Sequence, residues 1–227
     1  MRHSTVIRTA AIIAGGRLRA FSDLGALLRG VDLLICADGG LRAARSLRIR
    51  PHVAIGDFDS ASPALLRWAA RSGTRIITHP TEKDKTDTEL ALDFAAAAGA
   101  RTVDFLGALG GRLDHELANV ALLLRAKTAG VTMRIRDGGT MGCLAARRTA
   151  LSARIGDVVS LLPLSRRVTG VSTSGLRYPL HRATLSEGST LGVSNVVTAS
   201  RPVIRVGTGD LLIIVSAAAG TGRKLRS

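Results

Sequence analysis

The sequence predicts an α/β fold: an N-terminal α/β domain with a parallel sheet, followed by a C-terminal all-β sandwich domain. Over the first 136 residues, short apolar runs alternate with helix-like segments, as in a parallel sheet covered on both faces. From about residue 142 onward no convincing amphipathic helix is found, and short β-branched runs replace the alternation. The 227 residues suffice for two modest domains, which we place at residues 1–136 and 137–227.

The first domain contains predicted strands that are each followed by a turn rich in Gly, Asp or Ser or by a helix. The strands are expected at residues 5–14, 32–37, 53–55, 75–78, 102–106 and 131–136. The helices are expected at residues 23–28, 41–47, 63–72, 86–98 and 114–129. Ser62 followed by Pro63 predicts one helix start, and Thr86 with Glu89 predicts a capping box at another.

The second domain is predicted from β-branched runs that Gly, Ser, Thr and Pro separate. They lie at residues 157–162, 167–171, 193–198, 203–206 and 211–215. Because aromatic residues make up only 3 % of the chain, the cores of both domains must consist mainly of Ala, Leu, Val and Ile.

The net charge of +15, from 32 basic and 17 acidic residues, raises the question of nucleic-acid binding. However, the arginines are spread along the chain without a run of five, aromatic stacking surfaces are few, and no recognition motif is visible. Ala and Arg enrichment is also what a GC-rich coding bias produces. We therefore favour a small anionic ligand over nucleic acid.

The sequence has no pattern typical of a membrane-spanning segment, a secretory signal or a disulfide scaffold. No apolar run of about 18 residues predicts a membrane-spanning helix. Residues 1–8 reach charged positions before an apolar signal core could form, so no secretory signal is expected. Cys36 and Cys143 have no metal-binding spacing and do not suggest a disulfide scaffold, which favours the reducing cytoplasm.

Six of the 17 carboxylates come just after predicted strands, in loops that lead into helices. They are Asp38, Asp57, Asp59, Asp84, Asp87 and Asp114. In an open α/β sheet such loops share the carboxyl edge, where ligands bind. Clustered carboxylates repel one another unless cations neutralise them, and their hard oxygen atoms favour Mg²⁺. A simpler alternative for single members such as Asp87 and Asp114 is helix capping.

Three glycine pairs lie on the same edge and would let a phosphate approach backbone amides. They are Gly15-Gly16, Gly39-Gly40 and Gly110-Gly111. Lys83 and Lys85 flank Asp84, and they either balance that carboxylate, contact phosphate or lie on a solvated face. His115 is either an acid/base group or structural. No P-loop and no clean G-x-G-x-x-G motif is present, which argues against a standard NTPase or dehydrogenase. The pattern favours Mg²⁺-assisted phosphoryl-type transfer.

Six sequence blocks occur in order over roughly residues 5–215. They are Ala37-Asp38-Gly39-Gly40, Pro51 with Ile55-Gly56-Asp57-Phe58-Asp59-Ser60, Lys83-Asp84 with Thr86-Asp87, Gly110-Gly111-Arg112-Leu113-Asp114-His115 with Asn119, Ser172-Thr173-Ser174-Gly175-Leu176-Arg177-Tyr178-Pro179-Leu180, and Gly192-Val193-Ser194-Asn195. With these blocks the chain resembles the thiamine pyrophosphokinase (thiamine diphosphokinase) family.

The resemblance implies an N-terminal ATP-binding α/β domain, a C-terminal thiamine-binding β-sandwich, and a homodimer with active sites at the subunit interface. The implied reaction transfers a diphosphoryl group from ATP to the hydroxyl of thiamine and releases AMP. Together with the residue pattern, it suggests that Mg²⁺ is held by Asp57, Asp59, Asp84 and Asp87. Asp38 and Asp114 would complete the catalytic set, either of them accepting the hydroxyl proton.

The same resemblance assigns the substrate contacts. ATP would be bound by Gly15, Gly16, Gly39, Gly40, Gly110, Gly111 and Arg112. Thiamine would be bound by Ser172, Ser174, Tyr178, Ser194 and Asn195, where a Tyr178 ring can stack on the substrate.

Two alternatives remain open at the level of sequence. A related diphosphokinase would use the same carboxylates on another alcohol, such as 6-hydroxymethylpterin. A non-catalytic regulator that binds nucleotides or nucleic acid would instead explain the basic excess, although it would have no use for the acidic edge.

Overall fold

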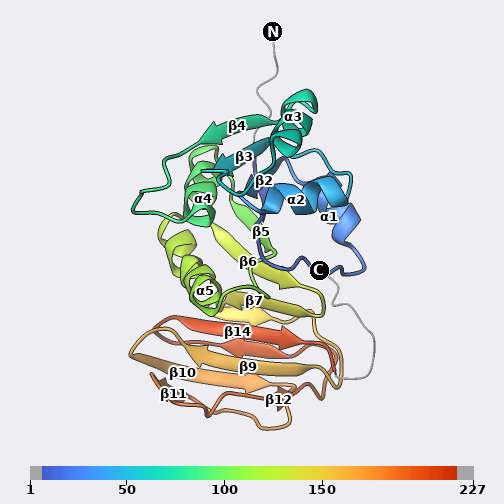
Figure 1. Ribbon diagram of the computed structural model, residues 1–227. Helices are drawn as coiled ribbons and strands as arrows, with labels where there is room; N and C mark the ends of the chain where they lie inside the picture. Colours follow the sequence, from blue (N-terminus) through green and yellow to red (C-terminus); the bar gives the residue numbers. More distant parts are fainter. Residues whose placement is uncertain (1–6, 219–227) are drawn as a thin grey trace. The chain divides into compact units, whose positions relative to one another are not determined.

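The computed structural model describes residues 7–218 and divides into two compact units (Figure 1). Unit 1 comprises the described residues up to 19 and residues 24–137, and unit 2 comprises residues 20–23 and the described residues from 138 onward. The structure is an α/β protein with an antiparallel β-rich second half, which confirms the predicted fold class.

Unit 1 is built on parallel strands in the order β6-β5-β1-β2-β3-β4. Their bounds are β1 Thr9–Ile13, β2 Leu33–Ala37, β3 Val53–Gly56, β4 Arg75–Thr78, β5 Thr102–Leu106 and β6 Thr132–Asp137. The chain runs outward from β1 to β4 and then returns to place β5 on the other side of β1. The strand order therefore reverses between β1 and β5, and the carboxyl ends of these strands are where an open α/β sheet binds ligands.

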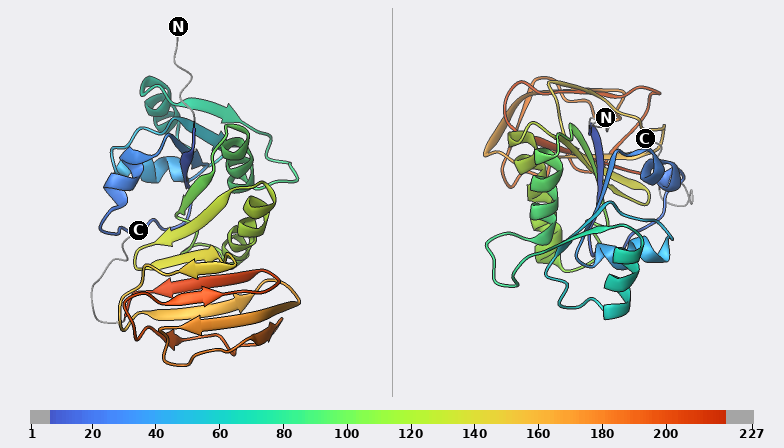
Figure 2. Two further views of the ribbon diagram at one scale, coloured as in Figure 1. Left: turned by 180° about the vertical axis from the view of Figure 1, so that it is seen from behind. Right: turned by 90° about the horizontal axis from the view of Figure 1, so that it is seen from above.

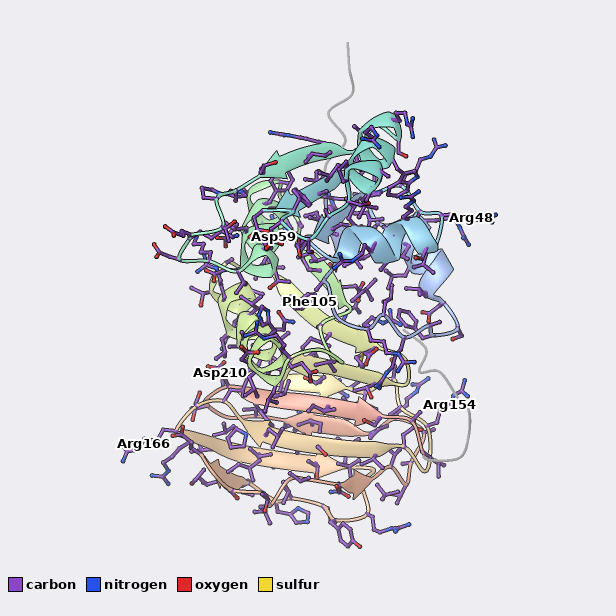
Figure 3. The ribbon with its side chains drawn as sticks, in the orientation of Figure 1. Arg48, Asp59, Phe105, Arg154, Arg166 and Asp210 are labelled. Atoms are coloured by element: carbon purple, nitrogen blue, oxygen red, sulfur yellow. The ribbon has the colours of Figure 1, made fainter. Side chains whose placement is uncertain are left out.

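Helices cover both faces of this sheet, as the right-hand view of Figure 2 shows. Helices α1 (Leu24–Gly30), α2 (Gly40–Ser46) and α3 (Pro63–Arg71) lie on one face, and α4 (Asp87–Ala97) and α5 (Leu113–Thr128) lie on the other. The central strands β1, β2, β3 and β5 are almost wholly buried, including Phe105 in β5 (Figure 3), whereas the edge strand β4 has exposed ends. Burial on both faces explains why these strands are continuous apolar runs.

The caps that the sequence predicts begin α3 and α4. The Ser62 hydroxyl accepts a hydrogen bond from the Leu65 amide at 3.2 Å, with Pro63 in the first turn. The Thr86 hydroxyl accepts one from the Glu89 amide, also at 3.2 Å. The Glu89 carboxylate forms an ion pair with Arg125 at 3.3 Å. Of the two side chains of the predicted capping box, Thr86 therefore caps the helix and Glu89 binds Arg125.

Unit 2 consists of two antiparallel sheets, with strand orders β12-β9-β14-β7 and β11-β10-β13-β8. The bounds are β7 Thr140–Leu144, β8 Arg148–Ala150, β9 Val158–Pro163, β10 Arg167–Ser174, β11 Ala183–Ser186, β12 Asn195–Val196, β13 Val203–Arg205 and β14 Leu211–Ser216. Their apolar side chains, among them Val159, Val171, Ile204 and Ile213, form one core. This is the predicted β-sandwich.

The strand predictions differ from the structure mainly in unit 2. The expected strand at 193–198 is reduced to β12, because Ser194 adopts a left-handed backbone with φ of 60°. Strands β7, β8 and β11 were not predicted, since each is short and only partly buried. In unit 1, the predicted strand at 5–14 is observed as β1, and its residues 5 and 6 lie outside the described part of the chain. Among the described residues, no helix is both long and apolar enough to cross a membrane.

Candidate active site

A cavity of about 540 Å³ opens at the carboxyl edge of the unit 1 sheet, where the strand order reverses. This volume is in the range of small-molecule sites. The loops after β1, β2 and β5, the segment before α4 and the start of α5 all contribute to its wall. The lining includes Gly15, Gly16, Asp38, Gly39, Arg42, Lys83, Asp84, Asp87, Gly111, Arg112, His115, Glu116 and Asn119.

The glycines let these loops pack against one another. A Cβ atom at Gly40 would lie 1.9 Å from the carbonyl oxygen of Ile13, and one at Gly16 would lie 2.4 Å from that of Gly107. Such contacts are far inside van der Waals range, so only glycine fits. Of the predicted ATP-binding glycines, Gly15, Gly16, Gly39 and Gly111 line the cavity, whereas Gly40 and Gly110 do not.

Three of the predicted carboxylates meet beside the cavity. Asp38, Asp57 and Asp59 each offer an oxygen atom that lies within 4.8 Å of those of the other two. Asp38 has a left-handed backbone with φ of 38°, and its Oδ1 is buried with no hydrogen-bond partner among the described residues. Asp59, in the loop after β3, is labelled in Figure 3. Clustered carboxylates with a buried oxygen that lacks a partner fit a hard cation such as Mg²⁺.

Lys83 joins a fourth carboxylate to this set. Its Nζ lies 3.2 Å from Asp57 Oδ2 and 3.3 Å from Asp87 Oδ1, and it donates to the carbonyl oxygen of Pro80 at 3.0 Å. Partial burial disfavours the charged ammonium, but the hydrogen bonds to the two carboxylates outweigh this effect and raise the pKa of Lys83. The lysine is therefore cationic at neutral pH.

The carboxylates influence each other's protonation. Burial raises the pKa of Asp38, and the negative charges of Asp87, Asp57 and Asp59 act in the same direction. The pKa of Asp57 is lowered, chiefly because its carboxylate accepts the backbone N–H of Asp59 and secondarily because Lys83 is close. The surroundings therefore favour the ionised form of Asp57. They disfavour the ionised form of Asp38, which is buried and close to three other carboxylates.

The other two predicted carboxylates lie apart from this group. Asp84 is exposed on the segment before α4. Asp114 forms an exposed ion pair with Arg112 at 2.7 Å, and this pair lowers the pKa of Asp114. The Arg112 guanidinium that we expected on phosphate is therefore bound to a neighbouring carboxylate in this structure.

The start of α5 contributes a residue that the sequence interpretation missed. The carboxylate of Glu116 accepts hydrogen bonds from the amides of both Gly110 and Gly111 at 2.8 Å. These are the amides that we expected to bind phosphate. The signal was present in the sequence, since Glu116 lies one helical turn after Arg112, the N-cap residue of α5.

Arg42 and Lys85 also differ from expectation. Arg42 was not singled out, but it lines the cavity from α2 and donates to the carbonyl and hydroxyl oxygens of Ser60 at 3.1 and 3.3 Å. Lys85, which we expected to act beside Lys83, also lines the cavity, and its Nζ lies 2.8 Å from Asp93. Asp93 also binds Arg125, so Lys85 belongs to a network of ion pairs that joins α4 and α5.

The predicted thiamine-binding residues lie around β10 and β12 of unit 2. The Asn195 side chain accepts from the Tyr178 amide at 3.0 Å and donates to the Tyr178 carbonyl at 2.6 Å. These bonds leave the Tyr178 side chain exposed at 64 %, free to contact a ligand. Ser172 accepts from the Arg182 amide, whereas Ser174 and Ser194 are exposed. Asn195 therefore positions Tyr178, a task that sequence spacing alone did not reveal.

Comparison with known proteins gives matches over both units. Residues 24–135 match the family described as thiamin pyrophosphokinase, catalytic domain, and residues 148–213 match thiamin pyrophosphokinase, vitamin B1 binding domain. The chain is 29 % identical to a thiamine pyrophosphokinase of Bacillus subtilis, over 92 % of this chain and 99 % of that protein. A rice relative, thiamine pyrophosphokinase 1, is 26 % identical over 83 % of this chain and 80 % of its own length.

Solved structures agree with these matches. The crystal structure of the Bacillus subtilis thiamine pyrophosphokinase has a TM-score of 0.82 at 28 % identity and covers 92 % of this chain and 99 % of its own. That of the thiamin pyrophosphokinase from Geobacillus thermodenitrificans has a TM-score of 0.79 at 31 % identity, with 93 % and 99 % covered.

Proposed function

The chain belongs to the thiamine pyrophosphokinase family and is a thiamine diphosphokinase, and from this premise we propose how its residues divide the work. Residues 1–136 form the catalytic domain that binds ATP and Mg²⁺, and residues 137–227 form the domain that binds thiamine. The alternative acceptor, 6-hydroxymethylpterin, is not favoured, because the family match in the second half is to a vitamin B1 binding domain.

The proposed reaction moves a diphosphoryl group from ATP to thiamine. The thiamine hydroxyl oxygen bonds to the β-phosphorus, and the bond from that phosphorus to the oxygen bridging it to the α-phosphorus breaks. The electron pair leaves with AMP, and the hydroxyl proton passes to a carboxylate. Asp38 suits this step because it lines the cavity and lies next to Asp57 and Asp59 without belonging to the predicted metal set.

The carboxylates beside the cavity would hold Mg²⁺. The observation that carries this proposal is the approach of Asp38, Asp57 and Asp59 to within 4.8 Å of one another. When bound, Mg²⁺ would neutralise charge on the ATP phosphates. Asp87 joins these carboxylates through Lys83, and Asp84 would need to turn inward to complete the predicted metal set of Asp57, Asp59, Asp84 and Asp87.

Cationic side chains would bind the remaining phosphate charge. Arg42 lines the cavity and is fixed by Ser60, so it presents a guanidinium at the cavity wall. Arg112 would serve in the same way after leaving Asp114, and this exposed pair is weak enough to exchange its partner for phosphate.

We further propose that the enzyme is a homodimer whose active sites combine residues of both subunits, and that it acts in the cytoplasm. The resemblance to the family supports the dimer. The small number of cysteines, with the Cys36 thiol buried and its pKa raised to about 12, supports a reducing compartment where no disulfide is needed.

Substitution of Asp57 tests the proposed metal role. In Asp57→Asn we expect AMP release and thiamine diphosphate formation to fall by at least about 100-fold, since a preorganised charge interaction of this kind contributes at that scale. Both products are measured with ATP, Mg²⁺ and thiamine, and with thiamine omitted to subtract ATP hydrolysis. Glu82→Gln removes an exposed carboxylate nearby and is the matched control. Wild-type rates in Asp57→Asn would disprove the role.

A further inference from the structure

Lys83 occupies the space between two of the carboxylates that the proposed function assigns to a cation. It lies on the segment between β4 and α4, and its side chain is only 16 % exposed. Its ammonium donates hydrogen bonds to Asp57 Oδ2 and to the carbonyl oxygen of Pro80, and it forms an ion pair with Asp87 Oδ1 at 3.3 Å. An ammonium with these three partners is held in place by the fold and is not a solvated surface charge.

Asp57 is shared between this lysine and the carboxylate cluster. One of its oxygens faces Lys83, while the residue also belongs to the group with Asp38 and Asp59. A cation bound by that group must therefore bind a carboxylate that is already paired. It must also approach a positive charge that lies a few ångströms away.

We propose that Lys83 is the internal counter-cation of this carboxylate cluster, and that it competes with the divalent cation for Asp57 and Asp87. The lysine neutralises the carboxylates and keeps them close together while no divalent cation is present. Binding of the divalent cation then requires the ammonium to give up at least the Asp57 contact. This inference rests on the proposed metal role of Asp57.

The chain supplies a matched comparison two residues away. Lys85 carries the same charge on the same segment, but its ammonium binds Asp93, in the ion-pair network with Arg125. Substitution of either lysine changes the net charge of the protein equally. Only Lys83 contacts a carboxylate of the proposed metal site, so a difference between the two variants isolates competition from the overall charge.

Direct metal binding tests the inference without any need for catalysis. Mn²⁺ alone is titrated into the full-length protein, and free Mn²⁺ is followed by electron paramagnetic resonance. We expect Lys83→Met to bind Mn²⁺ about tenfold more tightly than wild type, since a unit positive charge close to a divalent ion is removed. Lys85→Met should bind as wild type does. Thermal unfolding checks that each variant is folded.

The remaining outcomes are distinct. Unchanged or weaker Mn²⁺ binding in Lys83→Met overturns the inference, and weaker binding would mean that the lysine only positions the carboxylates. Equal tightening in both lysine variants also overturns it, because overall charge would then be the cause. The Asp57→Asn variant tests the premise separately. If it binds Mn²⁺ as tightly as wild type does, the proposed metal role of Asp57 fails, whatever the result for Lys83.

Discussion

At the scale of single residues, Asp38 shows that the site is assembled against local preference. Its backbone is left-handed, its Oδ1 is buried without a hydrogen-bond partner among the described residues, and three other carboxylates act on its charge. Each of these features costs stability and is retained where a function requires it. Nothing in the sequence around Asp38 distinguishes this strained residue from a helix-capping Asp.

The pH dependence of stability should reveal this cost. Because the pKa of Asp38 is higher in the folded protein than its usual value of 3.8, the folded state holds the proton more tightly. Asp38 therefore adds stability at acidic pH that is lost as pH rises through the folded pKa. We expect Asp38→Asn, which also tolerates the left-handed backbone, to melt at a higher temperature than wild type at pH 7 in EDTA.

This gain should shrink as pH falls towards about 4, where the carboxyl group of wild type also becomes neutral. Melting temperatures of both proteins across this range measure the difference. A variant less stable than wild type at pH 7 would show that the Asp38 carboxylate stabilises the metal-free fold. The same variant should lose most activity, in line with a trade-off between stability and function.

At the scale of elements, the start of α5 shows how a loop that lines the cavity is fixed. The Glu116 carboxylate reaches back from the first turns of α5 to the amides of Gly110 and Gly111. A protein carboxylate thus fills a place where a phosphate would otherwise be expected. The glycine pair shapes the loop, and we expect other groups that line the cavity, such as Arg42, to bind most of the phosphate.

Removing this carboxylate should therefore weaken nucleotide binding by loosening the loop. We expect Glu116→Ala to raise the KM for ATP about three- to tenfold with little change in kcat, since two hydrogen bonds to a charged group are lost. Glu116→Gln keeps one acceptor oxygen and should have a smaller effect. Steady-state kinetics with ATP varied at saturating thiamine give both constants.

Glu82→Ala, which removes an exposed carboxylate, should leave the KM for ATP unchanged. If Glu116→Ala instead lowered the KM for ATP, the carboxylate would be blocking an anion site and phosphate would bind the freed amides. That result would restore the original expectation for Gly110 and Gly111.

Sequence patterns predicted the elements of unit 1 more fully than those of unit 2, for a physical reason. Strands such as β5 are buried on both faces and helices such as α3 begin at Ser62 and Pro63, so each carries its own local signal. Strands β7 and β8 are held by pairing with distant strands, β11 pairs with the preceding β10, and all three are only partly buried. Their sequences therefore lack both a continuous apolar run and a clear alternation.

The sequence predicted which residue types gather at the site, but it did not predict which carboxylate pairs with which lysine or arginine. Its carboxylates follow strands, so their presence on one edge could be inferred from the order of the elements. Which carboxylate lies against which cation depends on side chains that meet from distant segments. Lys83 and Lys85 look alike in the sequence, yet one faces Asp57 and the other Asp93.

At the scale of the whole molecule, outward-pointing arginines occur in both units among the described residues. Figure 3 shows Arg48 pointing outward from unit 1 and Arg154 and Arg166 pointing outward from opposite ends of unit 2. Other arginines, such as Arg125, are bound to carboxylates. A nucleic-acid interface would instead be expected to gather basic side chains on one face. The informative charges are the few acidic ones at the cavity.

The proposed dimer makes a prediction about the whole assembly. Suppose that each active site uses unit 1 of one copy and unit 2 of the other. Two defective chains, Asp57→Asn in unit 1 and Tyr178→Ala in unit 2, then form a mixed dimer with one intact site. Mixed dimers, selected through a different tag on each chain, should have about half of wild-type activity, because one of their two sites is intact.

The two variants are co-expressed with different tags, purified through both, and assayed for thiamine diphosphate at low thiamine concentration. Asp57→Asn mixed with Asp59→Asn is the control, since every site would then contain a defective unit 1 and no activity should return. If the first pair gives no more than the sum of its separate activities, each site lies within one chain. The carboxylates of unit 1 and the exposed Tyr178 of unit 2 would then have to serve the same substrate from one polypeptide.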